Sequence, residues 1–122
     1  MAGQGYPDDA VPNLNYILGE PKEYNTSVAV SGTPNTHSIN TDLGRCATVG
    51  YILNDDPTND LRVYISKDGT TYNNYASLTA AQTASGWITL KPTEGLDLSK
   101  FWSHTIVVDA SGNTTAYRIV VI

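Results

Sequence analysis

The ten residues Leu61–Thr70, with the sequence LRVYISKDGT, decide the fold class of this chain. In the first six of them, apolar side chains alternate with polar or aromatic ones, which is the two-residue period of a strand with one buried face. The Asp-Gly pair that follows is typical of a tight hairpin turn. We therefore predict a strand over 61–66 that returns through Lys67–Thr70 into a partner strand containing Tyr72 and Tyr75.

Comparable runs lie on both sides of this hairpin. They are rich in Val, Ile, Thr and aromatic residues and are bounded by Gly, Pro, Asn or Asp, as strands usually are: Thr26–Ser31, His37–Thr41, Arg45–Leu53, Gly86–Lys91, Thr105–Asp109 and Thr115–Ile122. The last two flank Ala110–Asn113 and are predicted to form a second hairpin of central strands. Ser77–Ala84 is the only helix-compatible stretch, and it is short enough to be a loop or a single turn.

These runs predict an all-β fold. Seven to eight short strands leave no room for crossover helices, so the pairing must be antiparallel, and the domain is expected to be an antiparallel β-sandwich or a jelly-roll-like domain over residues 25–122. The apolar connection Leu96–Trp102 is expected to close one end of the sandwich. Both tryptophans, Trp87 and Trp102, are expected in the core.

The first two dozen residues have a different character. Met1–Glu23 is dominated by Gly, Pro, Asn and Asp, which disfavour an independent element, yet it carries apolar side chains that a solvated tail would not need. We predict that residues 1–24 form an extended N-terminal arm that orders on a partner. Its candidate partner-binding residues are Tyr6, Val11, Leu14, Tyr16, Ile17 and Leu18.

Composition and charge limit the classes of partner that we expect for this chain. The 122-residue chain has a net charge of −5, and its seven basic residues are scattered, so nucleic acid is not an expected partner. No run approaches the roughly 20 apolar residues that span a bilayer, and no signal peptide opens the chain. We expect synthesis in a cytoplasm and no membrane contact. The single Cys46 excludes an internal disulfide and is expected to be a small buried residue.

Few residues indicate chemistry. His37 and His104 are the only histidines, neither belongs to a cluster with metal-ligand spacing, and we expect them to be surface or hydrogen-bonded residues. No nucleophile motif is present, so we predict no catalytic residue, no cofactor and no metal site. The acidic loop 54–60 is the best cation candidate, since Ca²⁺ prefers clustered carboxylate and amide oxygens. Asp, Asn and Pro also crowd ordinary turns for purely conformational reasons, and we favour the turn over a cation site.

Aromatic residues offer one alternative. Tyr64, Tyr72 and Tyr75 gather around the first hairpin and could share a face, where flat rings with polar tips suit sugars. Half-buried packing on a sheet explains the same pattern. The alternative function is therefore a carbohydrate-binding β-sandwich module using this Tyr-rich face.

Two resemblances bear on function. The segment Val63–Tyr72 resembles the hairpin of discoidin-like and related jelly-roll modules, which implies the fold rather than an activity. The whole chain, acidic, rich in Thr and Asn, poor in Cys and led by an arm, resembles small accessory proteins of tailed-phage virions. That resemblance implies a non-enzymatic capsid decoration (cement) or fibre protein, located in the virion. It would be a homo-oligomer that binds the major capsid protein or other virion subunits and stabilises the particle.

Overall fold

The computed structural model describes residues 20–69 and 87–122, which form eight strands and one short helix. In chain order these elements are β1 (Lys22–Val28), β2 (Asn35–Ser38), α3 (Ile39–Leu43), β3 (Gly50–Asn54), β4 (Leu61–Ser66), β5 (Trp87–Leu90), β6 (Gly95–Asp97), β7 (Thr105–Ala110) and β8 (Thr115–Val121). The predicted Ser77–Ala84 stretch lies outside the described residues, as does the predicted hairpin strand with Tyr72 and Tyr75.

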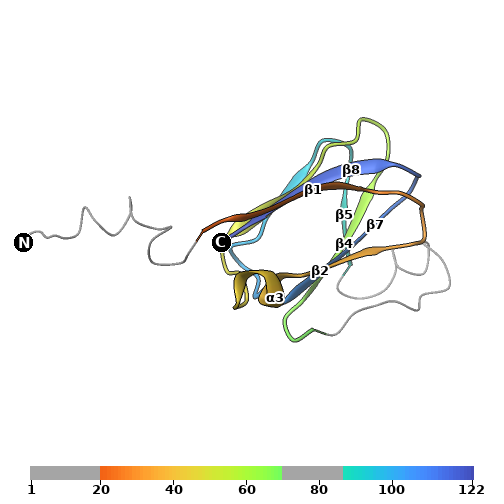
Figure 1. Ribbon diagram of the computed structural model, residues 1–122. Coiled ribbons are helices and arrows are strands. Elements are labelled where there is room, and N and C mark those ends of the chain that lie inside the picture. The colour runs from red at the N-terminus through yellow and green to blue at the C-terminus, as the bar shows by residue number, and fades with distance from the viewer. Residues whose placement is uncertain (1–19, 70–86) are drawn as a thin grey trace, which may run out of the picture.

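The strands form two antiparallel four-stranded sheets that face each other (Figure 1). One sheet has the order β1-β8-β3-β6 and the other β2-β7-β4-β5. Strand β1 pairs with β8, β2 with β7, β3 with β6 and β4 with β5, as in one long hairpin rolled up on itself. This is the arrangement of a jelly roll. The predicted all-β, antiparallel sandwich is confirmed.

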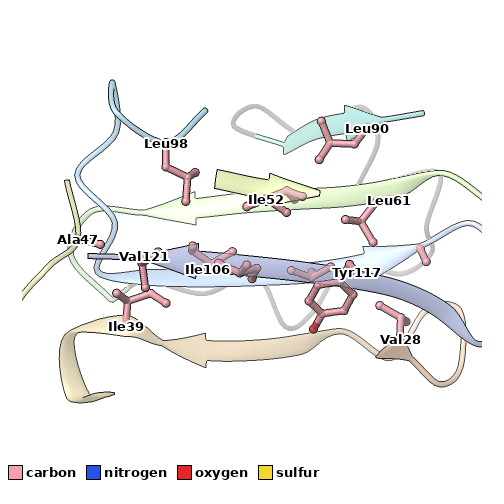
Figure 2. Packing of buried hydrophobic residues seen from close by; sticks show 14 residues of the cluster. Val28, Ile39, Ala47, Ile52, Leu61, Leu90, Leu98, Ile106, Tyr117 and Val121 are labelled. Atoms are coloured by element: carbon pink, nitrogen blue, oxygen red, sulfur yellow. The ribbon is translucent and has the colours of Figure 1, made fainter. Parts of the chain in front are cut away.

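The core fills the space between the two sheets. Alternate residues of β8 point inward, and Tyr117, Ile119 and Val121 are all fully buried. They meet Ile52 from β3 and Ile106 from β7, as Figure 2 shows. The period-two pattern of the sequence therefore corresponds to the inner faces of both sheets.

Strand β7 is buried at all six positions. The way β7 and β8 pair differs from one of the predictions. Both strands are central, as expected, and the last strand runs to within one residue of the chain end. They do not form a hairpin with each other, because β7 pairs with β2 and β4 while β8 pairs with β1 and β3. The turn after Ala110 carries the chain from one sheet to the other.

A second correction concerns the region after β2. The predicted strand His37–Thr41 ends at Ser38, and α3 begins at Ile39. Gly44 ends the helix in the left-handed conformation that glycine adopts readily. Ile39 is buried, so this single turn places an apolar side chain under the end of the sandwich.

The connection 96–102 behaves only partly as predicted. Leu98 is fully buried and Phe101 packs against the core, so the segment does close one end of the sandwich. Trp102, in contrast, is 59% exposed, and its predicted place in the core is wrong. Trp87, at the start of β5, is half-buried.

The N-terminal boundary also moves. Strand β1 begins at Lys22, three residues before the predicted start of the sandwich, and Tyr24 packs against the core. The start of β1 lies beside the C-terminus and near α3, at one end of the sandwich (Figure 1). Residues 1–19, with all six predicted partner-binding residues, lie outside the described part of the chain.

Candidate functional site

The predicted arm joins the sandwich at an edge strand. Among the described strands, β8 is the only one that pairs with β1. The first two residues of β1, Lys22 and Glu23, are charged and exposed, which is a common protection of sheet edges against unwanted pairing. Residues before Lys22 therefore continue directly from the outermost strand of one sheet.

A polar cluster lies directly behind this edge, between β1 and β2. The ring of His37 lies 4.5 Å from that of Tyr24, centroid to centroid, and its Nε2 is 2.6 Å from the hydroxyl oxygen of Tyr117. Asn35 donates from Nδ2 to the same hydroxyl oxygen at 3.0 Å and to the carbonyl of Ser27 at 2.9 Å. Figure 2 shows the hydroxyl of Tyr117 pointing from β8 toward β2. The cluster thus ties the edge strands of both sheets to a central strand.

Burial sets the ionisation of this cluster. It raises the pKa of Tyr117 to about 12, which the hydrogen bond from Asn35 partly opposes. It lowers the pKa of His37, against the opposing charge of Asp42. It also raises the pKa of Tyr24, to which the hydrogen bond from the Tyr24 hydroxyl to Asp42 adds. All three rings are consequently uncharged at neutral pH.

The Tyr-rich face is described only in part, since Tyr72 and Tyr75 lie outside the described residues. Tyr64 is half-buried, and its ring lies 5.6 Å from that of Trp87. Its neighbours on the outer side of the sheet, Arg62 on β4 and Val107 on β7, are almost fully buried. In the described region, Tyr64 takes part in packing rather than standing alone as a flat platform.

The acidic loop 54–60 uses its carboxylates internally. Asp56 accepts hydrogen bonds at one oxygen from the backbone of Thr58 and Asn59 and from the Thr58 hydroxyl. Asp55 accepts from two nitrogens of Arg118 at 2.8 and 3.2 Å. The hydrogen bonds to Asp56 lower its pKa, as expected for a turn-forming carboxylate. These contacts favour the reading of the loop as a turn.

The acidic loop also binds the strands around it. Asp60 lies 3.4 Å from the ammonium of Lys91 and 3.7 Å from the guanidinium of Arg62. Asn54 is fully buried and donates to three backbone carbonyls, including that of Leu90. The contacts of the loop therefore stabilise the end of the sandwich that lies away from Lys22, the first residue of β1.

The remaining reactive side chains are dispersed. His104 lies 2.8 Å from the hydroxyl of Thr105 through Nδ1, and Cys46 is half-buried with its thiol 3.8 Å from the side-chain oxygen of Asn40. Cys46 is thus less buried than predicted. Within residues 20–69 and 87–122, no three His, Cys, Asp or Glu side chains gather as metal ligands would.

Sequence reasoning missed the cluster behind β1. It treated His37 as a surface or hydrogen-bonded residue, and the structure gives it a hydrogen-bond partner 80 residues away. Only the alternation of Asn35 and His37 on one strand hinted that both side chains point to the same side. This alternation does not indicate which strand the side chains of Asn35 and His37 face.

Comparisons add no relative to this picture. Neither the scan of protein-family models nor the search of curated proteins returns a match for the chain. In the described part of the chain, no helix has the length and apolar character required to cross a bilayer.

Proposed function

We propose that this protein is a non-enzymatic structural protein of a virion, of the tailed-phage accessory type. In this proposal it decorates the capsid and stabilises the particle by binding the major capsid protein, or another virion subunit, through its N-terminal arm. The supporting observation is architectural. Residues 22–121 supply the eight described strands of a jelly roll, and the segment before them, which carries the six candidate partner-binding residues, is joined to an edge strand.

The reach of that segment supports attachment to a neighbour. Nineteen residues span up to about 65 Å when fully extended, whereas a folded domain of about 100 residues has a radius of gyration of about 13 Å. The segment is therefore long enough to pass beyond its own sandwich to an adjacent subunit. The start of β1 lies beside the C-terminus at one end of the sandwich (Figure 1).

The energetics suit a repeated lattice. Each apolar side chain that becomes fully buried contributes about 1.5–3 kcal/mol before the cost of ordering the chain. A few such anchors give modest affinity for one site, and a homo-oligomer on a symmetric shell multiplies it through avidity. Jelly rolls occur in viral capsid and lectin domains, but a fold shared by many proteins does not assign a function. The arm therefore carries the proposal.

The test uses particles produced without this protein. Purified full-length protein and a variant that begins at Glu20 are added to such particles, and bound protein is counted after sedimentation. We expect the full-length chain to bind stoichiometrically and to raise the particle's melting temperature. The Glu20 variant, which keeps β1 intact, is expected to remain folded and unbound.

A matched pair of variants separates the anchors from the length of the arm. Changing Tyr16, Ile17 and Leu18 to serine is expected to reduce binding strongly, whereas N13S with N15S, in the same segment, is expected to leave it unchanged. Normal decoration by the Glu20 variant would overturn the role of the arm. Failure of the full-length protein to bind any particle would overturn decoration altogether.

A further inference from the structure

We propose that the hydrogen bond between His37 on β2 and Tyr117 on β8 is a pH-sensitive latch, which opens when His37 takes up a proton. With the contacts of Asn35 to Ser27 and of His37 to Tyr24, it holds the edge strands β1 and β2 together. This inference concerns the isolated domain and does not depend on the proposed function. It rests on the position of the pair, between the two sheets at their shared edge.

The network fixes the direction of the hydrogen bond. Asn35 must present its amide nitrogen inward, because it donates to the carbonyl of Ser27, which can only accept. The same nitrogen donates to the hydroxyl oxygen of Tyr117. Among the described residues, the hydrogen-bond acceptor that the structure gives for the proton of Tyr117 is then Nε2 of His37 at 2.6 Å. His37 is therefore neutral, with its ring proton on Nδ1 and Nε2 as the acceptor.

Protonation reverses this bond. A proton on Nε2 converts the acceptor into a donor, so His37 and Asn35 both donate to Tyr117. The hydroxyl proton of Tyr117 loses its acceptor in a position that is fully buried. An unsatisfied buried donor carries the full cost of its lost hydration, and a partly buried positive charge adds to that cost. Separation of the edge strands lets water hydrate the Tyr117 hydroxyl and the charged imidazole, which removes both costs.

The charged and titratable groups around His37 determine how strongly it resists the proton. Tyr24 from β1 and Tyr117 from β8 flank the ring and are neutral, Asp42 on α3 favours the charged imidazolium, and the ammonium of Lys22 lies 5.5 Å from the Tyr24 ring centroid. Burial outweighs the attraction of Asp42, and the pKa of His37 is lowered. The folded protein therefore binds this proton less readily than the unfolded chain does.

The sign of the pH effect follows. Above the ordinary histidine pKa of about 6.5, His37 is neutral in both states and the latch is at full strength. As the pH falls from there toward the lowered pKa of the folded state, the opened form binds more protons and becomes favoured. The loss should first affect the two edge strands that meet at the cluster, β1 and β2, because each has a single strand partner in the described sheets. The seven-residue β1 offers more amides to follow than the four-residue β2.

Amide hydrogen exchange of the full-length protein tests the latch. Protection of β1 amides is measured by NMR between pH 7.5 and 5.0 and corrected for the intrinsic pH dependence of exchange. We expect the opening constant of β1 to rise by up to about tenfold per pH unit below about pH 6.5, the limit for one proton. Protection of the central strands β4 and β7 should change much less. Equal loss in all strands, or none in β1, would overturn the latch.

Variants identify the group responsible. His37→Phe keeps an aromatic ring and cannot titrate, so it should abolish the pH dependence of β1 opening. Tyr117→Phe removes the hydroxyl but leaves His37 buried and titratable, so it should weaken that pH dependence without abolishing it. His104→Gln, at the other histidine, should retain it. If either latch variant fails to fold, the NMR titration of His37 in the unmodified protein decides: its pKa must lie below about 6.5. A higher value would contradict the proposal.

Discussion

The boundary between arm and sandwich gives the sharpest stability prediction. A variant that begins at Glu20 keeps all of β1, whereas one that begins at Asn25, the boundary predicted from sequence, loses Lys22, Glu23 and Tyr24. We expect the first to be as stable as the full chain. The second should have a free energy of unfolding that is lower by about 1–3 kcal/mol, because it loses the packing of Tyr24 against the core.

The magnitude comes from three register pairs and one side chain. The Asn25 variant loses the pairing of residues 22–24 with Ile119–Val121. Those ladder hydrogen bonds contribute about 1 kcal/mol each, and the backbone entropy recovered by three residues, about 1–2 kcal/mol each, roughly offsets them. The half-buried Tyr24, which packs against the core and contacts His37, adds about 1–2 kcal/mol without such an offset.

Urea unfolding followed by tryptophan fluorescence measures the difference in the free energy of unfolding between the two truncated chains, and thermal unfolding measures the difference in Tm. In a domain of this size, 1 kcal/mol corresponds to about 4–8 °C in Tm, so the Asn25 variant should melt at least about 4 °C below the Glu20 variant. In the Glu20 background, Tyr24→Ala should reproduce most of the loss and Glu23→Ala, at an exposed position, little of it. Equal stability of the two truncated chains would refute the assignment of residues 22–24 to the folded sheet.

Three further predictions follow from individual contacts. Gly50→Ala should destabilise the protein by at least about 2 kcal/mol or prevent folding, since an added Cβ would lie 2.1 Å from the carbonyl oxygen of Val120; an unchanged urea midpoint would contradict this. Trp102→Ser should change stability by less than about 0.5 kcal/mol and remove the more quenchable fluorescence, because Trp102 is exposed and Trp87 half-buried; a large loss of stability would place Trp102 back in the core. Adding Ca²⁺ or a chelator should shift Tm by less than about 1 °C, because Asp56 already accepts three hydrogen bonds. A bound ligand at 100 Kd would contribute about 2.7 kcal/mol, or more than about 10 °C in a domain of this size, so clear stabilisation by Ca²⁺ would refute the turn reading of loop 54–60.

Local pattern was sufficient for most strands. The run 61–66 alternates in sequence and forms β4, and the Val- and Ile-rich runs near the C-terminus form β7 and β8, because side-chain alternation is a property of each strand alone. The tight hairpin predicted at the Asp-Gly pair is not confirmed, because its partner strand lies outside the described residues and β4 pairs with β5 along Leu61–Tyr64 and with β7 along Leu61–Ser66. Gly69 has a φ of +92°, and its amide donates to the Ser66 hydroxyl.

Pairing between strands was harder to predict. The residues 111–114 suit a hairpin and a crossing between sheets equally well, and the choice depends on β2, β4, β1 and β3, which lie far away in the sequence. The helix α3 had a local signal that was overlooked: Asn40 and Asp42 disfavour a strand, and Gly44 suits a helix end.

The candidate sites were least predictable, because they depend on tertiary contacts. His37 and Tyr117 meet across the sandwich from strands at opposite ends of the chain. Trp102 follows the buried Leu98 and the half-buried Phe101, and composition alone could not reveal that the Trp102 ring lies exposed. Long-range geometry decides both cases.

The central claim is that residues 1–19 attach a self-contained jelly roll to a particle. Hydrogen exchange with mass spectrometry, on the protein alone and bound to particles, tests it most directly. On docking, we expect protection from hydrogen exchange to increase mainly in peptides from residues 1–19, with Tyr16–Leu18 among the most affected. Protection of β3, β4, β7 and β8 should remain unchanged. Protection gained on the outer faces of the sandwich, with none in residues 1–19, would contradict it.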